Sequence, residues 1–260
     1  DNILSHPRLI SLYARLTGQS RIQAGQYQIN SDDSAKTLVN KFNRGEVVRY
    51  QITFPEGWAY RQWLQHLAAV EQFADIGKLS KAQIMRAAGI DKSHPEGWLF
   101  PDTYSYISTD TAVDILARAH IKMTEVLQVA WKNRSDDIPY ESAYQALIMA
   151  SIVEKETGLA AERPAIAGVF VRRLQKNMRL QTDPTVIYGI GPQFDGNLRK
   201  EDLRKDSPYN TYMRKGLPPT PIAMPSKESL QAVINPAKSD AIYFFTISHF
   251  SNYLKFSYLM

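Results

Sequence analysis

Residues 141–156 read ESAYQALIMASIVEKE and predict a single, unusually apolar helix. Glu154 lies in this helix on the face that also carries Leu147 and Ser151, seven and three residues upstream. Because that face should point into the core, we expect the Glu154 carboxyl to be partly desolvated. Desolvation disfavours the ionised carboxylate, so the sequence predicts a side chain that keeps its proton near neutral pH, as a general acid must.

The segments on either side of this helix predict a mixed α+β chain. Further helices are expected at 6–17, 34–44, 61–69, 81–88, 110–131, from residue 164 and at 227–234, and strands at 25–30, 48–54 and 241–247. Residues 1–54 then form a small strand–helix–strand module, and residues 55–260 a mixed, mainly helical domain with a small β portion. Residues 94–104 form an aromatic, proline-rich loop, and the long irregular stretch 179–225 is of the kind that is more often functional than idle.

The composition excludes several kinds of site. The 260 residues contain no cysteine, which rules out a disulfide framework, a thiolate zinc site and a cysteine nucleophile. The five histidines are scattered without metal-ligand spacing, and the sequence has neither a glycine-rich phosphate loop nor a G-x-S-x-G elbow. We therefore expect no metal and no cofactor.

The charge and the chain start bear on partners and location. The net charge of +5 favours contact with anionic polymers, but the basic residues come in short pairs, so we expect no nucleic-acid partner. No apolar run is long enough to span a bilayer, and no signal peptide opens the chain. Because the sequence starts at Asp1 without a methionine, we expect a targeting or anchor segment upstream.

Polar and aromatic groups gather in two downstream segments. Residues 180–185 (LQTDPT) and 209–212 (YNTY) supply amides, hydroxyls and rings. These suit a sugar site, because rings stack on the apolar faces of sugars and amides bind neighbouring hydroxyls. The alternatives are that the tyrosines and prolines only pack the loops, and that Glu154 only pairs with an arginine or caps a segment.

Three other carboxylates are candidates beside Glu154. Glu156 lies roughly 200° round the helix from it and near the helix end, so we expect Glu156 to face water. The two carboxylates should therefore not serve one cleft. Asp102 or Asp183 could supply the second carboxylate of a hydrolase.

Three ordered motifs carry a family resemblance. They are residues 150–157 (ASIVEKET), 179–189 (RLQTDPTVIYG) and 209–222 (YNTYMRKGLPPTPI), and residues 54–57 (FPEG) and 96–104 (EGWLFPDTY) fit as well. From about residue 20 to residue 245 the chain resembles the MltG (YceG-like) endolytic murein transglycosylases.

The resemblance implies both a site and a setting. Glu154 becomes the catalytic acid, and the residues expected to bind the glycan are Gln181, Thr182, Asp183, Tyr188, Asn210 and Tyr212. Residues 1–54 become a LysM-like module, incomplete at its amino end because only one clear helix lies between its strands, and residues 55–260 the transglycosylase catalytic domain. The residues after Phe245 depart from the family's usual tail. The setting is the periplasmic face of the bacterial inner membrane, with an anchor upstream and peptidoglycan synthases as partners.

The implied reaction needs a single carboxyl group. Protonated Glu154 would donate to the oxygen of the β-1,4 bond between N-acetylmuramic acid and N-acetylglucosamine, and would then accept the proton of the muramyl C6 hydroxyl, leaving a 1,6-anhydro end. Water is not consumed, so no second carboxylate is required. The resemblance also implies that cleavage ends nascent glycan strands. The alternatives are a muramidase, which leaves reducing ends, and a non-catalytic peptidoglycan-binding protein.

Overall fold

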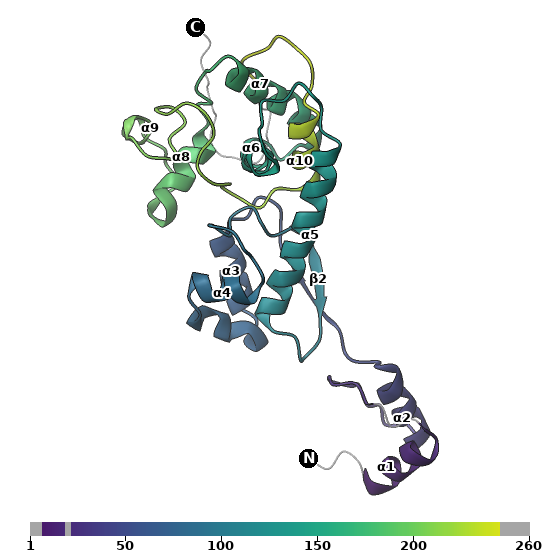
Figure 1. Cartoon of the computed structure of the whole chain (residues 1–260). Helices are drawn as coiled ribbons and strands as arrows, with labels where there is room; N and C mark the ends of the chain where they lie inside the picture. The colour runs from purple at the N-terminus through teal and green to yellow at the C-terminus, as the bar shows by residue number, and fades with distance from the viewer. Residues whose placement is uncertain (1–6, 19–21, 245–260) are drawn as a thin grey trace.

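The structure is a computed structural model that describes residues 7–18 and 22–244 (Figure 1). Its α-helices are α1 (Pro7–Leu16), α2 (Ala35–Arg44), α3 (Tyr60–Ala68), α4 (Lys81–Ala87), α5 (Ala112–Lys132), α6 (Ala143–Glu156), α7 (Arg163–Gln175), α8 (Asp183–Ile190), α9 (Lys200–Arg204) and α10 (Lys227–Ile234). Short 3-10 helices cover Glu71–Lys78, Ala160–Glu162 and Gly191–Gln193. The strands β1 (Tyr50–Thr53) and β2 (Thr103–Tyr106) form one antiparallel pair. The predicted mixed α+β class is confirmed.

Helix α6 is the centre of the larger body. It packs against α5, α7, α8 and α10, and Figure 1 shows it nearly end-on with α7 and α10 beside it. All nine residues from Ala146 to Glu154 are buried. A helix covered on every side has no polar face, which is why its sequence is apolar almost throughout.

The two strands connect distant parts of the chain. Tyr50 pairs with Tyr106 at one end of the ladder, and beyond its other end the Phe54 ring stacks on Trp63 of α3 with centroids 3.8 Å apart. Strand β2 begins at the end of the stretch predicted as a loop, residues 94–104. Its side chains are alternately exposed and buried, as expected for a strand with one face on a core.

The N-terminal part is less self-contained than predicted. Helices α1 and α2 pack on each other and lie apart from the larger body in Figure 1. The predicted strand 25–30 is reduced to a single antiparallel bridge between Tyr27 and Val47. The predicted strand 48–54 does form, as β1, but it pairs with β2 in the larger body. The apolar partners of Ile52 lie there, so the strand leaves the module.

Most helices lie where the sequence predicts them, but α8 lies in a stretch predicted as irregular. The predicted helices are present within about two residues at each end, from α1 to α7 and at α10. Helix α8, however, lies inside the stretch 179–225 predicted as irregular. Pro184 and Gly189 conceal it in the sequence, but a proline is tolerated in the first turn, where its missing N–H has no helical partner to lose.

The last described residues, 241–244, are irregular. Residues 241–244 form no strand, and the rest of the predicted strand 241–247, like the tail after it, lies outside the described residues. Within the ranges 7–18 and 22–244, no helix is both long and apolar enough to cross a bilayer.

Candidate active site

Glu154 is buried as predicted, but its contacts are those of an anchored carboxylate. Its Oε1 accepts a hydrogen bond from Arg163 Nη2 at 3.0 Å. Its Oε2 accepts from the backbone N–H of Ser226 at 2.9 Å, the Ser226 hydroxyl at 2.5 Å and the Ser229 hydroxyl at 2.7 Å. Each of these contacts places a protein donor on a carboxylate oxygen, and two of the donors, the Arg163 guanidinium and the Ser226 backbone N–H, can only donate.

The hydrogen bonds and ion pairs around Glu154 connect four segments: α6, α7, α10 and the turn after β1. Arg163, at the start of α7, also donates to the Ser226 hydroxyl at 2.8 Å and lies 3.6 Å from Glu56 Oε2. Burial raises the pKa of Glu56, and the negative charge of Glu154 raises it further. Glu154, Arg163, Ser226 and Ser229, which we call the Glu154 anchor, thus join α6 and α7 to α10 and to the turn after β1. This is the arginine pairing that the sequence left open as an alternative.

Glu156, and not Glu154, reaches the predicted sugar-binding loop. It is the last residue of α6 and half-buried, and its Oε1 accepts a hydrogen bond from the Thr182 hydroxyl. The expectation that Glu156 faces water is therefore wrong. The segment leading into α8 lies against the end of α6 at Glu156, while the neighbouring Lys155 is exposed.

Two more predicted residues gather beside Glu156. The Tyr212 hydroxyl donates to Asp183 Oδ1 at 2.5 Å. Burial raises the pKa of Tyr212, and the contact with Asp183 and the charge of Glu156 raise it further. Tyr212 therefore stays a hydrogen-bond donor next to the carboxylates. We call Glu156, Thr182, Asp183 and Tyr212 the Glu156 group.

Gln181 lies next to this group in a strained backbone conformation. Its φ is 53°, in the left-handed region, which costs a residue with a side chain about 1–2 kcal/mol. A hydrogen bond from its backbone N–H to the Thr211 carbonyl, 3.1 Å long, holds it there, and the side chain is exposed. Strain kept beside a polar group suits a side chain presented to a ligand.

Asn210 and Tyr188 point away from the Glu156 group. The buried Asn210 Nδ2 donates to three main-chain carbonyls within 202–205, and its Oδ1 accepts the Tyr212 N–H at 2.9 Å. Its amide is thus occupied within the chain and braces a loop, and the predicted contact of Asn210 with the glycan stays a prediction. The Tyr188 hydroxyl donates to Glu96 Oε2 at 2.9 Å.

The other candidates are placed elsewhere. Asp102 forms an ion pair with Lys122 and belongs to neither group. Among the described residues, no three His, Cys, Asp or Glu side chains are grouped so that they could hold a metal ion.

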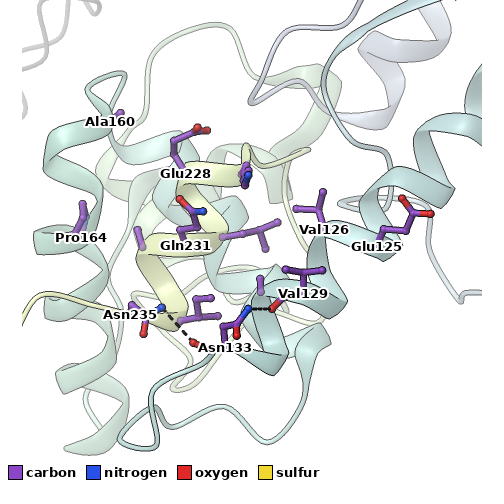
Figure 2. Close-up of a pocket in the computed structure, with 14 residues that line it drawn as sticks. Glu125, Val126, Val129, Asn133, Ala160, Pro164, Glu228, Gln231 and Asn235 are labelled. Carbon is purple, nitrogen blue, oxygen red and sulfur yellow. Dashed lines mark hydrogen bonds between the residues drawn. The ribbon is translucent and has the colours of Figure 1, made fainter.

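A cavity of about 690 Å³ lies between α5, α10 and the start of α7 (Figure 2). Val126 and Leu230 contribute to its apolar lining, and Glu125, Gln231 and Asn235 contribute polar groups. None of the predicted site residues lines this cavity, so it is a different place from the Glu156 group.

The sequence around Glu156 gives little sign that this residue meets the glycan-binding loop. Helical periodicity tells a buried position from an exposed one only when the helix has one apolar and one polar face. Helix α6 is buried on almost every side and lacks a polar face. The position of Glu156 could have indicated its contact with the loop, because Glu156 is the last residue of α6 and the end of a central helix is where it can meet a loop.

Comparisons with known proteins agree with the fold. The YceG-like family matches residues 1–258. An endolytic murein transglycosylase of Bacillus subtilis is 34% identical over 275 residues, which cover 96% of this chain and 74% of that protein. One from Streptococcus pneumoniae is 30% identical over 283 residues, covering 93% of this chain and 50% of that protein. A solved structure of a YceG-like protein from Listeria monocytogenes superposes with a TM-score of 0.61 at 29% identity, covering 92% of this chain and 84% of that one.

Proposed function

The chain belongs to the YceG-like family, and from that premise we propose that it cleaves peptidoglycan as an endolytic lytic transglycosylase. Its similarity to the Bacillus subtilis transglycosylase extends over 96% of this chain, so the whole catalytic region is compared and not one motif. The bond cut is the β-1,4 link between N-acetylmuramic acid and N-acetylglucosamine, and the products carry 1,6-anhydromuramyl ends.

We assign the acid to Glu156, in place of the sequence-based assignment to Glu154. One observation carries this choice: the Glu156 carboxylate accepts a hydrogen bond from Thr182, in the loop predicted to bind the glycan. Glu154 has Arg163 and two serines on its oxygens instead. A general acid must lie within hydrogen-bond reach of the glycosidic oxygen, and a carboxylate saturated by protein donors is poorly placed for that.

The reaction then follows from a single carboxyl group. Protonated Glu156 gives its proton to the leaving oxygen, and an oxocarbenium-like state develops at the muramyl C1. The Glu156 carboxylate next takes the proton of the C6 hydroxyl, which attacks C1 and closes the anhydro ring. Thr182 orients the Glu156 carboxyl, while Asp183, Tyr212 and the exposed Gln181 lie where they can contact sugar hydroxyls.

The biological setting completes the proposal. The residues before β1 serve as a LysM-like glycan-binding module, and the catalytic domain begins at β1 instead of at the predicted residue 55, because β1 pairs with β2. Both lie at the periplasmic face of the inner membrane behind an upstream anchor. Peptidoglycan synthases are the partners, and cleavage ends nascent strands. The support for this setting is the family resemblance; the chain spans about half the length of the pneumococcal relative.

The test compares two isosteric variants, Glu156→Gln and Glu154→Gln, in the intact chain. Each is incubated with purified sacculi, and the product termini are identified by mass spectrometry. We expect the wild type to release anhydro ends and Glu156→Gln to release none while keeping its fold and glycan binding. Because Glu154 lies outside the reaction in this scheme, Glu154→Gln should keep activity in the fraction that remains folded.

The opposite pattern would return the acid to Glu154. Reducing ends in place of anhydro ends would make the protein a muramidase. Glycan binding without any product would make it a non-catalytic binding protein.

A further inference from the structure

Two glutamates are buried among the described residues, Glu154 and Glu96, and Glu96 has no role in the proposed reaction. Glu96 is 3% exposed, and in the described part of the chain it makes no ion pair. Burying a carboxylate without a cation is costly, and such groups are retained where their contacts matter. Burial accordingly raises the pKa of Glu96 to about 7, against the opposing effect of two hydrogen bonds.

One carboxylate oxygen of Glu96 is hydrogen-bonded to the start of α3. Oε1 accepts the backbone N–H of Tyr60, the first residue of α3, at 2.8 Å. The next residue, Gly97, has a φ of 82°, and a Cβ there would lie 2.5 Å from Pro221 Cγ. The Glu96 loop is therefore pressed against both α3 and the segment that precedes α10, and it has little room to move.

The other oxygen of Glu96 holds α8. Oε2 accepts the hydroxyl of Tyr188, whose ring packs on Tyr209 with centroids 5.0 Å apart. The residue before α8 is Thr182, the donor to Glu156. Helix α8 is thus held at its start by the Glu156 contact and near its end by Glu96.

We propose that Glu96 is a positioning residue for glycan cleavage: its carboxyl holds Tyr188, and through it α8, so that Thr182 stays hydrogen-bonded to Glu156. This inference rests on the proposed function. Glu96 touches no reacting atom in this role. It acts on the end of an eight-residue helix whose start is held separately, because Asp183 accepts a hydrogen bond from Tyr212 and Thr185 is hydrogen-bonded to Thr211.

The variants are Glu96→Gln, Tyr188→Phe and their double, each in the intact chain. Glu96→Gln keeps the shape and an acceptor for the Tyr60 N–H but replaces the oxygen that accepts the Tyr188 hydroxyl by an amide NH2. Tyr188→Phe keeps the ring and removes the hydroxyl. The matched control is Tyr140→Phe, which removes a buried hydroxyl that has no hydrogen-bond partner among the described residues and lies near the opposite end of α6 from Glu156. Activity is measured as anhydro ends released from glycan strands, and hydrogen–deuterium exchange reports on the amides of 183–190.

We expect kcat to fall about tenfold or more in either single variant with KM within about twofold, because a displaced catalytic group weakens chemistry more than binding. The double variant should be no slower than the slower single variant, since both break one chain of contacts. Exchange in α8 should quicken in all three and stay unchanged in Tyr140→Phe.

Two outcomes overturn the inference: kcat within about twofold of wild type in both single variants, or α8 exchange that does not change. If Glu96→Gln fails to fold, Tyr188→Phe decides by the same criteria. If the wild type itself releases no product, the proposed function fails, and the exchange measurement still decides whether Glu96 holds α8.

Discussion

Glu154 and Glu156 are two residues apart on α6, yet they meet different surroundings. Glu154 contacts Arg163 and serines of α10, and Glu156 contacts Thr182 ahead of α8. What a carboxyl group can do is set by its neighbours and not by its identity. Stability and activity should therefore depend on different members of the pair.

The first prediction concerns stability. Glu154→Ala removes one partner of a buried ion pair and leaves the buried Arg163 with the more distant Glu56 as its remaining carboxylate among the described residues, which should cost about 3–5 kcal/mol of unfolding free energy. Glu156→Ala, at a half-buried position, should cost at most about 1–2 kcal/mol. Urea denaturation followed by circular dichroism measures both. Equal losses would argue against the anchor described here.

The second prediction separates stability from activity at Gln181. Gln181→Gly relieves the left-handed strain and should leave the unfolding free energy unchanged or raise it by up to about 1 kcal/mol. Glycan binding should weaken, because the exposed side chain is lost. Thermal denaturation and a glycan pull-down give the two readouts, and an unchanged affinity would remove Gln181 from the site.

At the scale of elements, the loop at 94–101 connects parts of the body that are far apart in sequence. Its Glu96 contacts α3 and α8, and His120 of α5 faces the Trp98 carbonyl at 3.1 Å. The aromatic and proline residues that make this stretch look irregular are the ones that fill the space between helices. An irregular segment can therefore be among the most rigid parts of a fold.

The third prediction tests this rigidity. Gly97→Ala places a Cβ against Pro221 in a left-handed conformation, and should cost about 2–4 kcal/mol. The control is Gly77→Ala, where nothing lies within 4 Å of the new Cβ, and its effect should stay within about 1 kcal/mol. Chemical denaturation of both variants decides. A Gly97→Ala protein as stable as the control would mean that the loop can yield.

For the whole molecule, the titration of Glu96 makes the free energy of unfolding depend on pH. The pKa of Glu96 is about 7 in the folded chain against an ordinary value of 4.5, so the folded state holds this proton more tightly. Its contribution to stability is therefore fully present below about pH 4.5 and is lost as the pH rises to about 7. The loss is about 3 kcal/mol at most.

The fourth prediction isolates the contribution of Glu96 by comparing the unfolding free energies of wild type and Glu96→Gln as a function of pH. Burial lowers the pKa of His94 and His120, so these groups change stability in the opposite direction over part of the same range. The unfolding free energy of Glu96→Gln minus that of wild type cancels their contribution. This difference should grow between about pH 4.5 and 7 and then level off. A flat difference would show that Glu96 does not titrate in this window.

The fifth prediction concerns where the N-terminal part ends. Strand β1 pairs with β2, and Ile52 and Phe54 are buried in the main core. A chain of residues 49–260 should therefore fold, whereas one of residues 55–260 exposes the partners of β1 and should be destabilised by several kcal/mol or aggregate. Circular dichroism and size-exclusion chromatography compare the two. Equal stability would support a boundary at residue 54.

By itself, the sequence determined the local structure and the family. Helical spacing located α6 and most other helices, because the periodicity of apolar residues is a property of each segment alone. The burial of Glu154 followed from the same pattern. Helix α8 escaped, since its proline and glycine obscure the signal.

Only the tertiary structure decided which groups meet. The serine partners of Glu154 lie 72 and 75 residues further along the chain, and β1 pairs with a strand about 50 residues away. A helix buried on all sides also carries no face that its sequence could mark as facing a ligand. Which glutamate meets the glycan-binding loop therefore depends on long-range packing, which no local pattern encodes.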